Sequence, residues 1–292
     1  MTLKKLNGLN AIISGASQGF GLAVAKHFVI EGANVMLCAR NQNQLFKAQA
    51  DLLALNHSTK IFALPADISK IEDVENLVIQ SLEKMGTIDI LIANAGIYGT
   101  KGAIDEIDWQ EWSHAIDINL KGTVLQCRSV IPHFKQKKAG KIIILSGGGA
   151  TKPMPYLSAY AASKAGVVRF AETLALELKS FNIDVNTVAP GALNTRLLAE
   201  VLTAGPDKVG DAFYQQSLQQ QKTGGTSLEI GASLCAFLAS AESNSITGKL
   251  LSAVWDPWQD LSRYKQELDQ SDIYTLRRIV PEDRGKKWEH DQ

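Results

Sequence analysis

Short apolar runs alternate with longer amphipathic segments along most of this chain, and this alternation constrains the fold more than any other feature. Apolar runs of about four to eight residues are typical of buried strands, and apolar residues that recur every three or four positions are typical of helices. Strands that alternate with helices form a parallel sheet, because each helix returns the chain to the start of the next strand. The predicted strands are residues 10–14, 34–39, 60–64, 88–93, 141–146, 183–188 and 249–254, and the predicted helices include residues 22–31, 42–55, 74–85, 109–134 and 159–180.

This order of elements predicts the α/β class, with a Rossmann-like doubly wound parallel sheet in a single domain over residues 1–254. Two regions depart from it. Residues 193–227 are rich in glutamine and interrupted by glycine, so we expect a helical insertion that serves as a substrate lid. Residues 255–292 contain three of the five tryptophans but no further strand. Because aromatic residues are scarce in disordered segments, we expect an ordered C-terminal extension that lies against the domain or a neighbouring subunit.

The composition gives no reason to expect several classes of partner, although local basic patches remain possible. The 30 basic and 30 acidic residues give no net charge, so nothing indicates binding to nucleic acid or to an anionic membrane. Cys38, Cys127 and Cys235 are far apart among apolar residues, which indicates buried thiols rather than disulfides or a metal site. No signal peptide or membrane-spanning run is apparent, so we expect a cytoplasmic protein.

A glycine-rich segment, residues 14–21, follows the first predicted strand and leads into a helix. Its glycines allow a tight turn and the close approach of a pyrophosphate to the helix N-terminus. The alternative is that they only punctuate a turn between a strand and a helix, but their place after the first strand favours phosphate binding. The candidate cofactor-binding residues here are Gly15, Ser17, Gln18, Gly19, Phe20 and Gly21.

The end of the second predicted strand indicates which dinucleotide would bind. A carboxylate at this place commonly holds the adenosine ribose, but here the sequence is Cys38-Ala39-Arg40. The Arg40 guanidinium can instead pair with a 2′-phosphate, which favours NADP(H), with NAD(H) as the alternative. Arg40 as a solvated strand end is the competing interpretation, because neither Ser17 nor Gln18 adds a second positive charge.

Tyr160 and Lys164 are four residues apart and therefore share one helical face. A phenol has a pKa of about 10, so a nearby ammonium is needed to make it a useful acid or base near neutrality. Such a pair alone is commonly a packed ring beside a solvated amine, and its meaning depends on the residues that precede it. Those residues are Asp67 and Ile68 after the third strand, Asn94, Ala95 and Gly96 after the fourth, Asn119 in a helix, and Ser146 at the end of the fifth strand.

Taken in order, these motifs resemble the short-chain dehydrogenase/reductase family over residues 6–254. The resemblance implies hydride transfer between a nicotinamide and a carbonyl or alcohol carbon. It implies that Tyr160 is the general acid or base, that Lys164 lowers its pKa and holds the nicotinamide ribose, and that Asn119 positions a water. It also implies that Asp67 and Ile68 flank the adenine, that Asn94 steadies the central strands, and that Pro190, Gly191 and Thr195 meet the carboxamide.

The chain departs from the family pattern at the substrate-orienting serine. That serine usually stands thirteen positions before the tyrosine, where this chain has Gly147, and Ser146 is one residue earlier. Either the glycine-rich turn brings Ser146 inward or backbone amides of the turn replace the serine. Phe20 replaces the common isoleucine of the first turn, and Val254-Trp255-Asp256 replaces the usual Asp-Gly-Gly.

These observations predict an NAD(P)(H)-dependent oxidoreductase that acts on a small molecule and prefers NADP(H). Gly147 leaves open a second class, a catalytically impaired NADP-binding regulatory or scaffolding protein. A sugar-nucleotide epimerase or dehydratase would share the Tyr and Lys pair, but residues 255–292 look too short for its substrate domain. The apolar surface of helices 109–134 and 159–180 and the resemblance together suggest a homodimer or homotetramer. The substrate itself is not encoded in these motifs.

Overall fold

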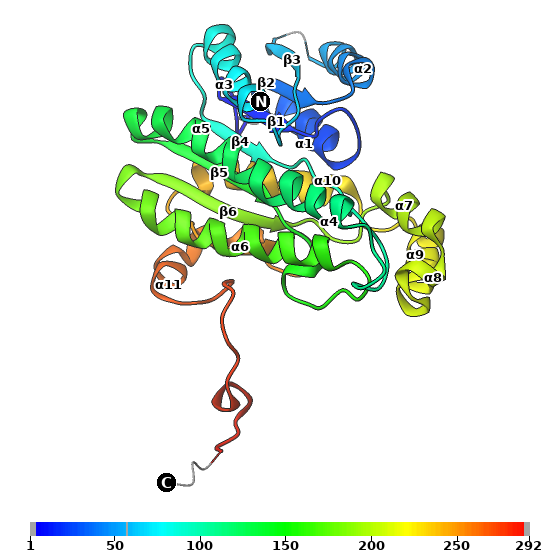
Figure 1. The fold of residues 1–292 in the computed structure, drawn as a ribbon. Helices are drawn as coiled ribbons and strands as arrows, with labels where there is room; N and C mark the ends of the chain where they lie inside the picture. Colours follow the sequence, from blue (N-terminus) through cyan, green and yellow to red (C-terminus); the bar gives the residue numbers. More distant parts are fainter. Residues whose placement is uncertain (1–3, 57, 289–292) are drawn as a thin grey trace.

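A computed structural model describes residues 4–56 and 58–288, and it is built on one parallel sheet. The seven strands lie in the order β3-β2-β1-β4-β5-β6-β7 (Figure 1). All the predicted strands form, with ends that move by at most two residues, and the predicted Rossmann-like fold class is confirmed. The strands are β1 (Asn10–Ser14), β2 (Asn34–Ala39), β3 (Ile61–Pro65), β4 (Ile90–Ala93), β5 (Gly140–Leu145), β6 (Ile183–Ala189) and β7 (Leu250–Ser252).

Helices cover both faces of the sheet, so its side chains are buried on either side. One core joins α1 (Gly19–Ile30), α2 (Gln42–Leu53) and α10 (Leu228–Ala239) to the sheet. The other joins α3 (Ile71–Met85), α5 (Gly122–Lys137) and α6 (Ser158–Leu178). Successive residues of β1 enter opposite cores, as the two-residue period of a strand requires, with Ile13 in the first and Ile12 in the second.

The helix predicted over residues 109–134 forms without a break, but one of its turns is a π-helix rather than an α-helix. The structure has α4 (Trp109–Ile116), then the π-helix η1 (Asp117–Lys121), then α5. A π-helix holds one more residue per turn than an α-helix and is frequent at functional sites. It places Asn119 in the interior of the protein.

The insertion after β6 is helical, as predicted. It contains α7 (Arg196–Ala204), α8 (Pro206–Val209) and α9 (Asp211–Thr223), which stand together at one end of the molecule (Figure 1). An ion pair of 3.7 Å between Lys101 and Glu200 links α7 to the loop that follows β4. The action of the insertion as a substrate lid stays a prediction.

The first half of the C-terminal extension packs against the sheet domain, as expected. Trp258 and Leu261 in η5 (Trp258–Arg263) and Leu268 in α11 (Lys265–Gln270) belong to the first core. The Leu250 amide of β7 donates to the Tyr274 carbonyl at 2.7 Å, which binds the extension along the edge of the sheet.

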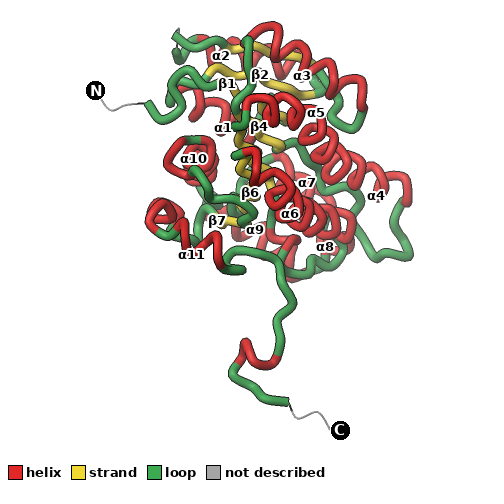
Figure 2. The backbone as a smooth tube through the Cα atoms, turned by 90° about the vertical axis from the view of Figure 1, so that its left-hand side faces the viewer, coloured by secondary structure: helices red, strands yellow, loops and turns green. Residues whose placement is uncertain are grey.

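Beyond Leu276 the chain leaves the body of the protein. Residues 277–288, here called the arm, run away from the sheet domain in both views (Figure 1, Figure 2). Within the arm, η6 (Pro281–Arg284) is closed by two hydrogen bonds from the Arg277 guanidinium to Asp283, of 2.6 and 2.8 Å. The expectation that the extension lies against its own domain is therefore wrong for the arm, and contact with a neighbouring subunit stays a prediction.

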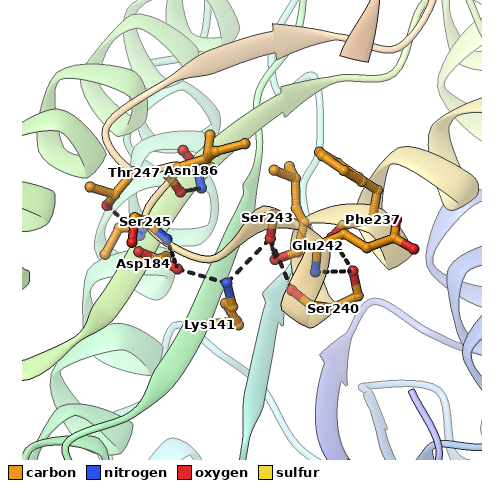
Figure 3. A network of polar contacts seen from close by, with 12 residues as sticks. Lys141, Asp184, Asn186, Phe237, Ser240, Glu242, Ser243, Ser245 and Thr247 are labelled. Carbon is orange, nitrogen blue, oxygen red and sulfur yellow. Dashed lines mark hydrogen bonds and ion pairs between the residues drawn. The ribbon is translucent and has the colours of Figure 1, made fainter. Parts of the chain in front are cut away.

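A polar network fastens the amino-terminal ends of β5 and β6 (Figure 3). The Lys141 ammonium donates to the Asp184 carboxylate at 2.6 Å and to the Ser243 hydroxyl at 3.2 Å. Asp184 also accepts from the Ser245 amide at 3.2 Å. Burial lowers the pKa of Lys141, and the Asp184 charge only partly offsets this effect. The amino-terminal edge of the sheet is thus held by polar contacts that are partly buried at Lys141 and Asp184.

Candidate active site

A cavity of about 1300 Å³ lies at the carboxyl-terminal edge of the sheet. Parallel strands bring their carboxyl ends to the same edge, so residues that follow different strands meet there. With the exception of Asn119, every residue proposed from the sequence for catalysis or cofactor binding lines this cavity.

The glycine-rich turn forms one wall of the cavity, and its shape requires glycine. Gly15 and Gly19 have φ angles of 65° and 57°, in the left-handed region. A Cβ at Gly21 would lie 2.3 Å from the Gly15 carbonyl oxygen and 2.4 Å from Asn94 Nδ2. Gln18, the residue before α1, makes no side-chain cap, so the turn leaves the first amides of the helix available to an anion.

Asn94 braces this turn from the end of β4. Its side-chain amide donates to the Ser14 carbonyl at 2.8 Å and to the Gly15 carbonyl at 3.3 Å. The Ser14 hydroxyl in turn accepts from the amides of Asn94 and Ala95 at 3.1 and 3.2 Å. These bonds join β1 to β4 at the cavity, which is the steadying position expected for Asn94.

Arg40 and Asp67 line the cavity after β2 and β3. Burial raises the pKa of the Asp67 carboxyl, but hydrogen bonds from Ser69 and the charges of Arg40 and Lys70 outweigh it, so the pKa lies below its usual value. Arg40 is exposed and thus free to pair with an anion in the cavity. Ile68, which is buried, adds an apolar surface beside them.

Tyr160 and Lys164 enter the cavity from α6. The Lys164 ammonium donates to the Leu145 carbonyl at 2.6 Å and lies 5.7 Å from the centre of the Tyr160 ring. Burial lowers the pKa of Lys164 to about 8. Burial also raises the pKa of Tyr160, with a smaller contribution from Tyr98. The protein alone therefore shifts the Tyr160 pKa in the opposite direction to that expected from the Lys164 charge, because both groups are withdrawn from water.

Asn119 lies beside the cavity and is held by the protein. Its amide nitrogen donates to the Ile97 carbonyl at 2.8 Å and to the Ser163 hydroxyl at 2.9 Å, and its oxygen accepts from the Ile97 amide at 2.9 Å. Both amide hydrogens are thus engaged, and they tie the loop after β4 to α6. The expected water-positioning role of Asn119 stays a prediction.

Ser146 and Gly147 occupy different places at the end of β5. Ser146 is 4% exposed, and its hydroxyl donates to the Lys164 carbonyl at 3.5 Å. Gly147 faces the tyrosine, since a Cβ there would lie 2.5 Å from the Tyr160 hydroxyl oxygen. The glycine at 147 therefore leaves no room for a side chain against the Tyr160 hydroxyl, and the Ser146 hydroxyl donates to a different group. A contribution of Ser146 to catalysis remains a prediction.

The turn after β6 closes the cavity on the side of the insertion. Gly191 has a φ of 98°, and a Cβ there would lie 2.8 Å from Val254 Cγ2. Thr195 precedes α7, and its Cγ2 would lie 3.6 Å from a Cβ placed on Gly19. The cavity wall formed by Pro190, Gly191 and Thr195 therefore faces the glycine-rich turn.

Several aromatic side chains line the cavity without having been predicted. Tyr98 packs edge-on against Tyr160, with ring centroids 4.6 Å apart. Tyr274, from the C-terminal extension, is a second unpredicted lining residue, and Trp255 is a third. Of these three, only Tyr98 could have been found from the sequence, because it stands two residues after Gly96, a residue already expected to line the cofactor site.

Within residues 4–56 and 58–288 no helix is long and apolar enough to cross a membrane. The same residues contain no group of three or more His, Cys, Asp or Glu side chains that could hold a metal ion.

Residues 9–204 match the family described as short chain dehydrogenase. The chain is 36% identical over 248 residues to 3beta-hydroxysteroid dehydrogenase 1 of Eggerthella lenta, covering 84% of this chain and 92% of the relative. It is 30% identical over 246 residues to dehydrogenase/reductase SDR family member 4 of Sus scrofa, covering 84% and 86%.

Two solved structures have the same fold. One is 3-ketoacyl-(acyl-carrier-protein) reductase from Brucella melitensis complexed with NADH, with a TM-score of 0.73 and 31% identity over 84% of this chain and 96% of the other. NAD⁺-bound xylitol dehydrogenase gives a TM-score of 0.78 at 25% identity, over 85% and 98%. With this fold, this cavity and these relatives, the chain belongs to the short-chain dehydrogenase family and is an oxidoreductase.

Proposed function

We propose that this oxidoreductase uses NAD(P)(H), with NADP(H) preferred, to interconvert a carbonyl and an alcohol on a small molecule. The observation that carries the proposal is the lining of one cavity. A glycine-rich turn with unused helix amides and the Tyr160 side chain line the same cavity. Among the described residues the Tyr160 hydroxyl has no hydrogen-bond partner, so it is free to meet a substrate oxygen.

The glycine-rich turn and Arg40 would hold the phosphates of the dinucleotide, and Lys164 would hold its nicotinamide ribose. The bound nicotinamide supplies the hydride that reduces the carbonyl carbon, or accepts it in the reverse reaction. Tyr160 gives its phenolic proton to the carbonyl oxygen in reduction and takes a proton from the alcohol in oxidation. Asn119 keeps the loop after β4 in register with α6, and so fixes the wall beside Tyr160.

The test of activity is the oxidation of NADPH in the presence of cyclohexanone, acetophenone, ethyl acetoacetate and 9,10-phenanthrenequinone. We expect turnover with at least one of these compounds and its loss in Tyr160→Phe, with cofactor affinity nearly unchanged. Tyr264→Phe is the matched control, because Tyr264 is half-exposed and does not line the cavity. Tight cofactor binding without turnover on any carbonyl would instead favour the regulatory or scaffolding protein.

Cofactor preference is tested by fluorescence titration of NADPH and NADH. A charged hydrogen bond contributes about 1.5–3 kcal/mol, so we expect NADPH to bind roughly tenfold to a hundredfold more tightly. Arg40→Ala should abolish this difference, whereas Arg278→Ala, in the exposed arm, should keep it. Two solved relatives contain NAD⁺ or NADH, so the opposite preference is a real alternative. Equal affinities or a preference for NADH would refute the role of Arg40.

A further inference from the structure

The surroundings of the Tyr160 hydroxyl are incomplete for a carbonyl substrate. A carbonyl oxygen has two lone pairs, and a donor on each holds it in one orientation. Tyr160 fills one of these places. The neighbouring place belongs to Gly147, which has no side chain, and even a Cβ there would lie 2.5 Å from the Tyr160 hydroxyl oxygen. A second side-chain donor must therefore come from a residue other than Gly147.

Three hydroxyl groups of the cavity wall near the Gly147 turn and Tyr160 are candidates for this second donor. The Ser146 hydroxyl is buried and donates to the Lys164 carbonyl. Thr151 lies after the turn with an exposed side chain, so its hydroxyl is surrounded by water. Tyr98 differs from both, because its ring is half-buried against the Tyr160 ring, at 4.6 Å between centroids and 64° between planes.

The Tyr98 hydroxyl is available for a ligand. No hydrogen bond to another described residue engages it, although its side chain lines the same cavity as Tyr160. The two phenols are near enough that a charge on Tyr98 raises the pKa of Tyr160. Two tyrosine side chains whose hydroxyls have no partner among the described residues therefore line one cavity, from the loop after β4 and from helix α6.

Charged groups surround the Tyr98 ring, and its burial keeps the phenol protonated. The Lys101 ammonium lies 5.9 Å from the ring centroid, donates to the Gly99 carbonyl at 3.2 Å and pairs with Glu200 at 3.7 Å. Burial, with a smaller contribution from the Glu200 charge, raises the pKa of Tyr98 to about 12. Near neutral pH the phenol keeps its hydrogen, and it can therefore donate.

We propose that the Tyr98 hydroxyl donates the second hydrogen bond to the substrate oxygen, in place of a side chain at residue 147. This inference rests on the proposed function. In reduction the substrate oxygen receives its new proton from Tyr160, while Tyr98 keeps its own proton throughout. Its bond to the oxygen strengthens as negative charge develops there, so it acts mainly on the chemical step.

The decisive variant is Tyr98→Phe, made in the full chain and assayed with the most active ketone of the four named above. The phenylalanine ring keeps the contacts with Tyr160 and Lys101 and removes only the hydroxyl. We expect kcat to fall by about tenfold to a hundredfold, as for the loss of one donor to a developing oxyanion. KM, the NADPH dissociation constant and Tm should change little, and Tyr264→Phe should behave as the unchanged protein does.

Gly147→Ser supplies an independent test. A conventional serine at this position would lie too close to the Tyr160 hydroxyl, so we expect it to lower kcat and not to rescue the activity of Tyr98→Phe. A kcat within twofold of the unchanged protein in Tyr98→Phe would overturn the role of Tyr98. Restoration of activity by serine in the double variant would overturn the crowding at residue 147 and would support the loss of a donor in Tyr98→Phe. Absence of turnover in the unchanged protein would refute the proposed function itself. Loss of turnover in Tyr160→Phe but not in Tyr98→Phe would support the proposed function and refute the role of Tyr98.

Discussion

Replacement of Trp258 by alanine tests how much the buried half of the C-terminal extension contributes to the stability of the protein. The Trp258 ring is 8% exposed, lies 5.8 Å from the Phe237 ring of α10, and donates from Nε1 to the Ala253 carbonyl at 3.1 Å. A buried Trp→Ala change costs about 3–5 kcal/mol, of which the hydrogen bond contributes about 1 and the aromatic pair about 0.5–1.5. For a chain of this length each kcal/mol lowers Tm by roughly 2 °C, so Trp258→Ala should lower Tm by about 6–10 °C.

The matched control is Trp255→Ala, because Trp255 stands three residues earlier and is 85% exposed. Exposed substitutions usually stay within about 0.5 kcal/mol, which corresponds to a Tm change of about 1 °C. Scanning calorimetry without cofactor measures both variants, and Trp258→Phe should fall between them since it keeps most of the ring. Equal Tm values for the two alanine variants, or a fall below about 2 °C in Trp258→Ala, would refute the placement of the extension in the core.

Three further outcomes are expected. Truncation after Leu276 removes the arm but no core residue, so it should leave the thermal stability of the monomer almost unchanged. Truncation after Asp256 also removes Trp258 and two core leucines, so it should destabilise the monomer strongly. Because the Lys164 pKa falls from 10.5 to about 8 on folding, the unfolded chain binds more protons between these pH values. The unfolding free energy of the cofactor-free protein relative to Lys164→Met should therefore rise from pH 8 to 10.5, and a difference independent of pH would contradict the burial of the ammonium. Light scattering should show a homodimer or homotetramer, since Leu176 of α6 is 77% exposed and apolar, and a monomer mass at all concentrations would be the contrary result.

The carboxyl-terminal ends of the strands explain why most of the candidate site could be predicted from the sequence. Gly15, Arg40, Asp67 and Asn94 each follow a different strand, and a parallel sheet brings such residues together wherever its helices lie. The departure from the family pattern at Gly147 could also be predicted, because this residue stands thirteen positions before Tyr160. That it, rather than Ser146, faces Tyr160 required the backbone geometry, because neighbouring residues in a turn point in different directions.

Other features had no usable signal in the sequence. Helix α10 is buried almost all round, so its sequence lacks the polar face from which amphipathic helices are recognised. The expected pKa of Tyr160 failed for a different reason: the charge of Lys164 was counted, but the loss of water around both groups was not. Tyr274 reaches the cavity only because the extension folds back along β7, a contact between distant parts of the chain.

The π-helix between α4 and α5 makes this part of the molecule sensitive to insertions and deletions. Each residue of an α-helix turns the chain by about 100°, and the wider turn at Asp117–Lys121 absorbs one extra residue between two regular helices. Loss of a single residue from this turn would rotate Asn119 relative to α5, away from Ile97 and Ser163. In a relative that lacks one residue of this turn, an asparagine aligned with Asn119 would therefore have a different orientation. The length of the segment from α4 to α5 is therefore as informative for comparing relatives as the identity of residue 119.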